Sequence, residues 1–196
     1  MIPLGPIVRL QVQTSSLKIG EGNQQRFDLG ALRSVEEIEV DDGGVWGIAA
    51  DGPRIADVHH RDHPRSKIRG TLNGISAGFT RHYAEMRNRF GDHMTNGVAA
   101  ESILIDYDQI VDLSALEQGI VVQTQTGAMV HLVEFAIAEP CAPFSRWSLR
   151  YPEGKRPDRT VTETLQFLSN GLRGYYCRYI GPPARIRLGD QAFFAD

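Results

Sequence analysis

Apolar and polar residues alternate along much of this chain, and the alternation predicts many short strands. In residues 7–13 (IVRLQVQ), Val8, Leu10 and Val12 are separated by mostly polar neighbours, which is typical of a strand with one buried face. Residues 34–40 and the segment VWGIAA flank the turn DDGG at 41–44, and this arrangement predicts a hairpin.

The second half of the chain repeats this pattern. The segment IVVQTQTGAMVHLVEFAIAEP predicts two strands joined at Thr126-Gly127. Its second strand is apolar on both faces apart from His131 and Glu134, so we expect it inside the sheet, delivering Cys141 at its C-terminal end. GYYCRYI and ARIRL predict two closing strands, which are followed by a Gly189-Asp190 turn and QAFFA.

Two segments have helical spacing instead. Phe79, Tyr83, Met86 and Phe90 step by four, three and four residues, which predicts a helix capped by Ser76 and ended by Gly91. Thr160 and Glu163 form a capping-box pattern for a second helix, with Val161, Leu165, Leu168 and Leu172 on one face. Residues 52–70 have neither period and predict a long loop.

Many short strands with few helices favour a mainly β, α+β fold, a β-barrel with a few peripheral helices. The 196 residues predict a single domain, 1–196. Hydrophobic residues make up 41%, charged residues 23%, and the formal net charge is −3, so we expect an ordinary globular protein with no nucleic-acid partner. Neither a signal peptide nor a membrane span is indicated, and a cytoplasmic protein that does not bind membranes is expected.

Only two cysteines occur, at Cys141 and Cys177, without disulfide or zinc-knuckle spacing. Pro140 and Pro143 restrict the backbone around Cys141, which suits a metal ligand or sulfur donor. An ordinary proline-rich strand end with a packed thiol explains the same residues. Cys177 lies among aromatic residues and is expected in the core.

Four segments occur along the chain in the order DVHHRDH, GVAAESILID, AEPCAPF and GLRGYYCRYIGPPARIRLGD. Together they resemble the MOSC domain, the module similar to the C-terminal part of molybdenum cofactor sulfurase. The matching residues are Asp57, His59, Gly97, Glu101, Cys141, Gly171, Gly174, Gly181, Gly189 and Asp190. One departure is Ser102, which stands where the family has Asn.

The resemblance implies a MOSC-type β-barrel and two uses for Cys141. In the first, the thiolate is the protein ligand of molybdenum in a molybdenum cofactor (molybdopterin), in an oxidoreductase that reduces N-hydroxylated substrates such as amidoximes and hydroxylamines. In the second, Cys141 carries a persulfide as a sulfur carrier or transferase. A non-catalytic cofactor-binding module is a third alternative.

The resemblance also suggests how the cofactor is held. Lys67, Arg69 and Thr71 offer two cations and a hydroxyl on one side of an extended segment, and Arg173 is a further cation for the cofactor phosphate. Glu101 could accept hydrogen bonds from pterin N–H groups or hold a loop in place. A solvated basic loop is the alternative explanation for the cations.

Partners follow from the same interpretation. The chain lacks a flavin, haem or ferredoxin-type cysteine pattern, so an external electron-donor protein or a sulfur donor is expected. Pyridoxal phosphate, used by the separate sulfurase domain, is expected only through a partner. His59 and His63, with Asp57 or Asp62, offer nitrogen and oxygen ligands, but Pro64 prevents a helix that would pair them for zinc.

Overall fold

The computed structural model describes residues 1–49, 52–66, 72–153 and 155–196. The strands are β1 (Ile2–Gln13), β2 (Lys18–Ile19), β3 (Arg26–Phe27), β4 (Leu32–Val35), β5 (Glu37–Asp41), β6 (Gly44–Ile48), β7 (Ile55–Ala56), β8 (Ile75–Phe79), β9 (Ile103–Ile105), β10 (Ile120–Gln123), β11 (Met129–Ile137), β12 (Tyr175–Tyr179), β13 (Ala184–Arg187) and β14 (Gln191–Phe194). The helices are α1 (Thr80–Phe90), α2 (Ala142–Ser148) and α3 (Arg159–Ser169), with 3₁₀ turns at Gly22–Gln24, Leu29–Ala31, Leu72–Gly74 and Ser114–Leu116.

Seven strands of the described chain close into a mixed β-barrel. The ring runs β1–β9–β8–β12–β11–β10–β14 and returns to β1, because the long β1 pairs with β14 near its start and with β9 further along. The β8–β9 pair is parallel and the other pairs of the ring are antiparallel. This confirms the predicted mainly β class with peripheral helices.

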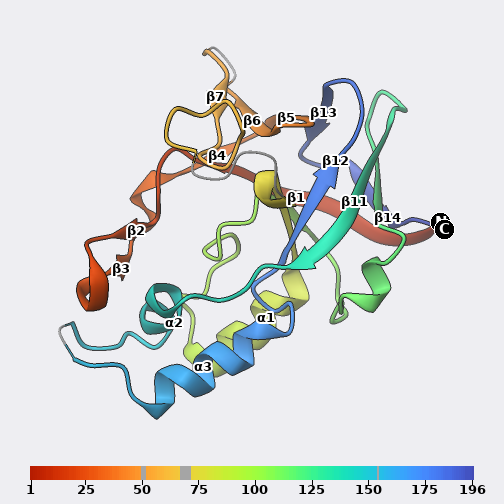
Figure 1. The fold of residues 1–196 in the computed structure, drawn as a ribbon. Helices are drawn as coiled ribbons and strands as arrows, with labels where there is room; N and C mark the ends of the chain where they lie inside the picture. Colours follow the sequence, from red (N-terminus) through yellow and green to blue (C-terminus); the bar gives the residue numbers. More distant parts are fainter. Residues whose placement is uncertain (50–51, 67–71, 154) are drawn as a thin grey trace.

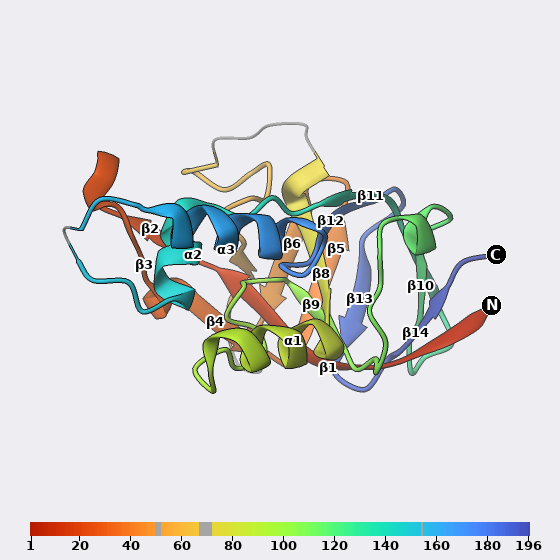
Figure 2. The same ribbon diagram turned by 90° about the horizontal axis from the view of Figure 1, so that it is seen from below.

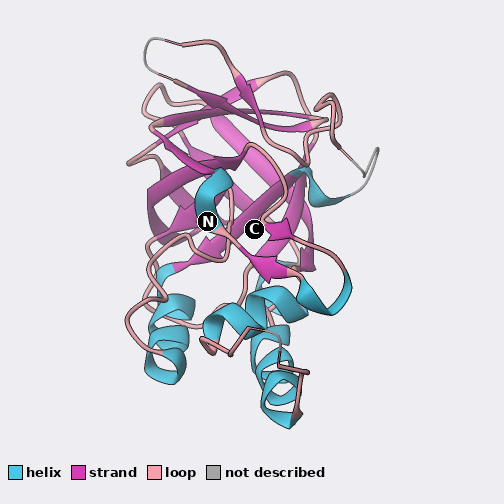
Figure 3. Ribbon diagram, turned by 90° about the vertical axis from the view of Figure 1, so that its left-hand side faces the viewer, coloured by secondary structure: helices cyan, strands magenta, loops and turns pink. Residues whose placement is uncertain are grey.

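Two additions complete the architecture. A four-stranded sheet, β13–β5–β6–β7, lies against the barrel and contains the predicted DDGG hairpin as β5 and β6. The helices gather together at one end of the molecule, with the strands at the other (Figure 3), and α1, α2 and α3 lie on the same side of the barrel (Figures 1 and 2). The termini are adjacent, with the Met1 ammonium 2.8 Å from the Asp196 carboxylate.

The apolar side chains form two clusters. One fills the barrel, extends to β5, β6 and β13 of the four-stranded sheet, and includes Ile75, Phe79 and Tyr175. The other lies between the helices and the outer barrel wall, and includes Met86, Leu104, Phe144 and Leu168. Full burial of a large apolar side chain contributes roughly 1.5–3 kcal/mol, so both clusters stabilise the fold. No described helix is long and apolar enough to cross a membrane.

The predicted helix cap at Ser76 is wrong. Residues 75–79 form β8, and α1 begins only at Thr80, because β8 pairs with both β12 and β9. Phe79 therefore packs inside the barrel instead of on the helix. The end of the helix is confirmed, since Gly91 is its C-cap with φ of 101°.

Other local details also differ from the sequence prediction. The cap of α3 is Asp158, whose carboxylate accepts from the Thr160 N–H, while Glu163 pairs with Arg159. In β1 the register shifts after Ile7, so Val8 is exposed although its spacing predicts burial. The short α2 helix directly follows Cys141 and was not predicted.

Candidate functional site

A cavity of about 310 Å³ opens on the outer wall of the barrel. Val12, Ile75 and Tyr175 belong to the larger apolar cluster, and the residues that follow them, Gln13, Ser76 and Tyr176, lie on the opposite face of their strands and line the cavity. Its remaining walls come from the β2–β3 region, the 58–66 loop, the segments before β9 and after β11, and the start of β12 with the residues just before it. They are Ser16, Leu17, Lys18, Phe27, Val58, His59, Arg65, Ser66, Ala99, Ala100, Glu101, Ala138, Glu139, Arg173 and Tyr175.

Glu101 is a buried carboxylate in this wall. Tyr83 of α1 donates a hydrogen bond of 2.6 Å to Glu101 Oε2, and the same hydroxyl accepts from the Ala99 N–H at 3.0 Å. The carboxylate lies over Gly78, where a Cβ would collide with Oε1. Gly78 therefore provides the space that Glu101 occupies.

Burial also changes the proton affinity of this pair. The pKa of Glu101 is raised to about 7, first because burial disfavours the charged carboxylate, although the Tyr83 hydrogen bond and the nearby Arg173 and Arg9 lower it. Burial beside Glu101 raises the pKa of Tyr83 well above its ordinary value. Glu101 can consequently change its charge near neutral pH.

Arg173 comes from the segment before β12. Its Nη1 donates to the Glu139 carbonyl oxygen at 2.9 Å, and its guanidinium lies 5.5 Å from the centre of the Phe144 ring. The buried Nε has no hydrogen-bond partner among the described residues. An unpaired buried donor is costly, so a ligand that accepts from this nitrogen would be stabilised.

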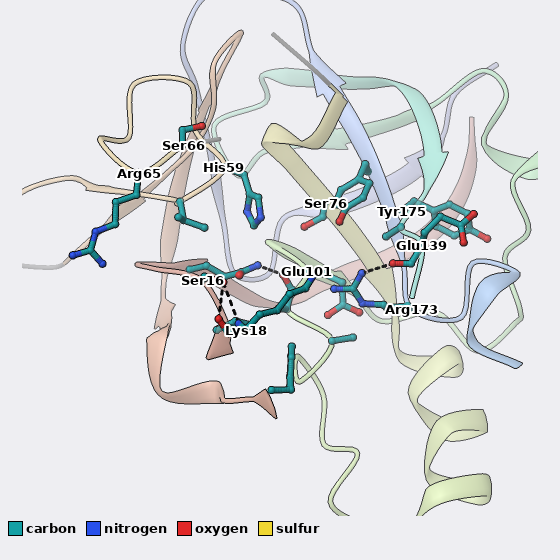
Figure 4. A pocket seen from close by; sticks show the side chains of 18 residues that line it. Ser16, Lys18, His59, Arg65, Ser66, Ser76, Glu101, Glu139, Arg173 and Tyr175 are labelled. Carbon is teal, nitrogen blue, oxygen red and sulfur yellow. Dashed lines mark hydrogen bonds between the residues drawn. The ribbon is translucent and has the colours of Figure 1, made fainter. Parts of the chain in front are cut away.

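His59 lies on another wall of the cavity, held by Asp57. The Asp57 Oδ1 atom is 2.9 Å from both the backbone nitrogen and Nδ1 of His59, and Oδ2 accepts from the Gln13 N–H at 2.6 Å. Figure 4 shows the His59 ring directed toward the space between Ser76 and Glu101. Lys18 and Arg65, both exposed, add positive charge to the walls.

The other histidines of this loop have different roles. His60 is fully buried, with Nε2 3.0 Å from Asp41 Oδ1 and its ring centre 4.4 Å from that of Trp46. His63 accepts the Arg65 N–H through Nδ1. In the described ranges, no group of three or more His, Cys, Asp or Glu residues is placed to hold a metal ion.

Cys141 is half-buried and forms the N-cap of α2. It follows β11 as predicted, but it packs against the helix-side cluster that contains Leu17 and Phe27 and does not line the cavity. Glu139, two residues earlier, does line it. Cys177 is in the barrel core as predicted, where burial strongly raises the pKa of its thiol.

The remaining predicted residues fall into two groups. Lys67, Arg69 and Thr71 lie outside the described residues. Ser102 is buried, and its N–H donates to Ser76 Oγ at 3.0 Å, so it links the segment before β9 to β8. The structure thus brings Glu101 and Arg173 to one cavity and leaves Cys141 beside it.

Sequence reasoning missed Tyr83 as a partner of the site. Its spacing identified a buried helix face, which is correct. A buried tyrosine hydroxyl needs a hydrogen-bond partner, and this requirement was the available signal. Lys18, Ser76 and Tyr176 gave no such signal, because only the barrel wall brings them together.

No protein-family model and no curated protein matches the sequence. Solved structures are similar in fold. They include the YuaD protein from Bacillus subtilis (16% identity, TM-score 0.50, 95% of this chain and 96% of that one) and a hypothetical protein (12% identity, TM-score 0.53, 97% and 70%). YiiM from Geobacillus stearothermophilus is 14% identical with a TM-score of 0.47, over 100% and 75% of the two chains. At these identities the first two support the fold alone.

Proposed function

We propose that this protein binds the molybdenum cofactor in the outer-wall cavity and reduces N-hydroxylated compounds, as its resemblance to the MOSC domain implies. The observation that carries the proposal is the meeting of Glu101 and Arg173 in one cavity wall, where the buried Nε of Arg173 has no hydrogen-bond partner in the part of the chain that the structure describes. These residues come from two of the four motif segments, 72 positions apart in the chain.

The donor set of the cavity suits the anionic and hydrogen-bonding parts of the cofactor. Arg173, Lys18 and Arg65 supply positive charge for a phosphate, and Glu101 supplies acceptors for pterin N–H groups. The volume is at the lower end of the roughly 300–1,000 Å³ typical of ligand pockets. When bound, the cofactor would deliver two electrons to the substrate, drawn from an external electron-donor protein.

Cys141 is the proposed molybdenum ligand, and its position sets a condition on the proposal. Because the thiol packs beside the cavity, segment 138–141 has to shift for the sulfur to reach a metal there. The same observation favours a second candidate function, a cofactor-binding module without turnover. Such a module would hold the pterin through Arg173 and Glu101 and would not use Cys141.

Metal and pterin analysis tests both candidates, using protein expressed in a host that makes the cofactor. Arg173→Met should lower cofactor occupancy by about 10-fold or more, since a hydrogen bond to a charged group contributes roughly 1.5–3 kcal/mol. Cys141→Ala should lower molybdenum more than pterin. Arg178→Met is the matched control, because Arg178 is an exposed residue of β12 that pairs with Glu134 outside the cavity.

The outcomes separate the hypotheses. Wild-type protein without pterin would overturn cofactor binding in any form. Equal molybdenum in wild type and Cys141→Ala would remove Cys141 as the ligand. Bound cofactor with no reduction of amidoximes or hydroxylamines, when electrons are supplied, would favour the binding module.

A further inference from the structure

The Asp57–His59 pair has the geometry of an oriented imidazole. The Asp57 side chain is 4% exposed, and its two oxygens are held by two backbone N–H groups, from Gln13 and His59. Oδ1 also lies 2.9 Å from His59 Nδ1. Three contacts therefore hold the carboxylate at the end of β1 and determine where the histidine ring points.

This contact also determines which ring nitrogen is available. An ionised carboxylate can only accept hydrogen bonds, so in the neutral imidazole the proton is on Nδ1 and Nε2 is the nitrogen with a free lone pair. The His59 side chain is 32% exposed and lines the cavity. Nε2 can thus exchange a proton with solvent and with a molecule bound in the cavity.

The neighbouring histidines do not share this arrangement. Asp41 contacts His60 Nε2, and the Asp62 N–H donates to His60 Nδ1, so both ring nitrogens are occupied. His63 does not line the cavity. In the described part of the 57–66 loop, His59 is the histidine with a ring nitrogen available to a cavity ligand.

We infer that His59 is the catalytic proton donor of this cavity and that Asp57 is its positioning residue. The inference rests on the proposed function. The overall reaction is R–NHOH + 2 H⁺ + 2 e⁻ → R–NH₂ + H₂O, with the electrons taken from an external electron-donor protein. The N–O bond breaks, and the leaving hydroxyl departs as water after taking the proton of His59 Nε2–H.

The second proton reaches the substrate nitrogen from solvent, and His59 regains its proton from solvent through its exposed edge. Asp57 stabilises the imidazolium before the transfer and keeps the ring aimed at the cavity. The other charged or titratable groups of the cavity wall are Lys18, Arg65, Glu101, Glu139, Arg173, Tyr175 and Tyr176. Among these, Glu101 is held by Tyr83.

His59→Gln tests the inference, with His63→Gln as the matched control from the same loop. In cofactor-loaded protein, His59→Gln should lower kcat for a hydroxylamine by about 100-fold or more, the usual contribution of general acid catalysis, with KM little changed. Added imidazole should partly restore turnover to His59→Ala, which a structural defect would not allow.

A second readout needs no cofactor. Nitrogen-15 NMR of the unloaded protein should show the neutral His59 ring protonated at Nδ1, and Asp57→Asn should weaken this preference. A proton on Nε2 in the wild type would overturn the inference, as would an unchanged kcat in His59→Gln. Loss of cofactor from His59→Gln would also overturn it and assign His59 to binding. Wild type without pterin would instead overturn the proposed function, and the catalytic role of His59 with it.

Discussion

Glu101 shows how far burial alone can alter one residue. Its pKa of about 7 lies above the ordinary carboxyl value because folding removes the carboxylate from water. A group whose pKa is raised in the folded state contributes stability below its unfolded pKa and loses that contribution as pH rises through the folded value. For Glu101 the affected window runs from about pH 4.5 to about pH 7.

Glu101→Gln should remove this pH dependence. At pH 5 the wild-type side chain is mostly protonated when folded, whereas at pH 8 it is a buried charge. The free energy of unfolding of the variant minus that of the wild type should therefore be about 2–3 kcal/mol larger at pH 8 than at pH 5. This value takes roughly 1.4 kcal/mol for each unit by which the pKa is raised. Urea unfolding at both pH values measures the difference.

Glu139→Gln is the control for this prediction, since Glu139 is an exposed carboxylate of the same cavity. Its difference from wild type should stay constant between pH 5 and pH 8. A constant difference for Glu101→Gln would show that burial of this carboxylate does not affect folding.

At the scale of single elements, β1 makes the barrel possible. It pairs with β14, β9 and β4 in turn, and its register shifts between Pro3 and Gly5. Gly5 has φ of 146°, and a Cβ there would collide with the Asp106 carbonyl oxygen beside β9. The bend at Gly5 therefore allows one strand to serve both pairings.

Gly5→Ala should destabilise the fold by about 3 kcal/mol or more, because overpacking against backbone adds to the cost of the positive φ. Gly127→Ala is the control. Gly127 also has a positive φ, of 85°, but a Cβ added there would meet no atom within 4 Å. Gly127→Ala should lower the free energy of unfolding by about 1 kcal/mol in the same urea measurement. Equal decreases for Gly5→Ala and Gly127→Ala would contradict the proposed collision.

Element predictions succeeded where local pattern and tertiary pairing agree. The β5–β6 hairpin and the β10–β11 pair follow from turn residues between apolar runs. The Ser76 cap failed because residues 75–79 gain more from pairing on both sides than from helix formation. The α2 helix was missed because its seven residues are too few to show a helical period.

For the whole molecule, two buried groups give opposite pH dependences. Burial lowers the pKa of His82 to about 4, and its Nε2 accepts from the Val111 N–H at 3.1 Å. A histidine with a lowered folded pKa contributes stability that is complete above its unfolded value near 6.5 and is lost as pH falls toward 4. Across much of this pH range, deprotonation of buried Glu101 lowers the stability of the fold as pH rises, whereas deprotonation of His82 increases it.

In His82→Gln, the pH dependence of the free energy of unfolding that Glu101 causes should therefore become visible. Between pH 5 and pH 6.5 the two effects oppose each other in the wild type. Without His82, the free energy of unfolding should fall as pH rises through this range, by about 2 kcal/mol relative to wild type. Unfolding curves collected in half-unit pH steps would measure this, and parallel curves for variant and wild type would contradict it.

The fold was largely predictable because its strands and turns depend on short segments of sequence. The candidate site was only partly predictable because it also depends on how distant segments come together. Motif spacing identified Glu101, Arg173 and Cys141 as residues of interest, since their chemistry is local to short segments. Whether they share a cavity depends on which barrel face each segment occupies. The pairing of β8 with β9 and β12 decides that for Glu101 and Arg173. Cys141 instead follows β11 at the start of α2, where it packs against the helix-side cluster.

The sequence alone determined the strand-rich class, the main turns, the end of α1 and the burial of Cys177, because alternation, glycine and local apolar content act over a few residues. Only the tertiary structure decided that the strands close through β1, that Tyr83 holds Glu101, and that Asp57 aims His59 at the cavity. These features depend on contacts between distant segments, whose free energy exists only once the barrel has brought them together.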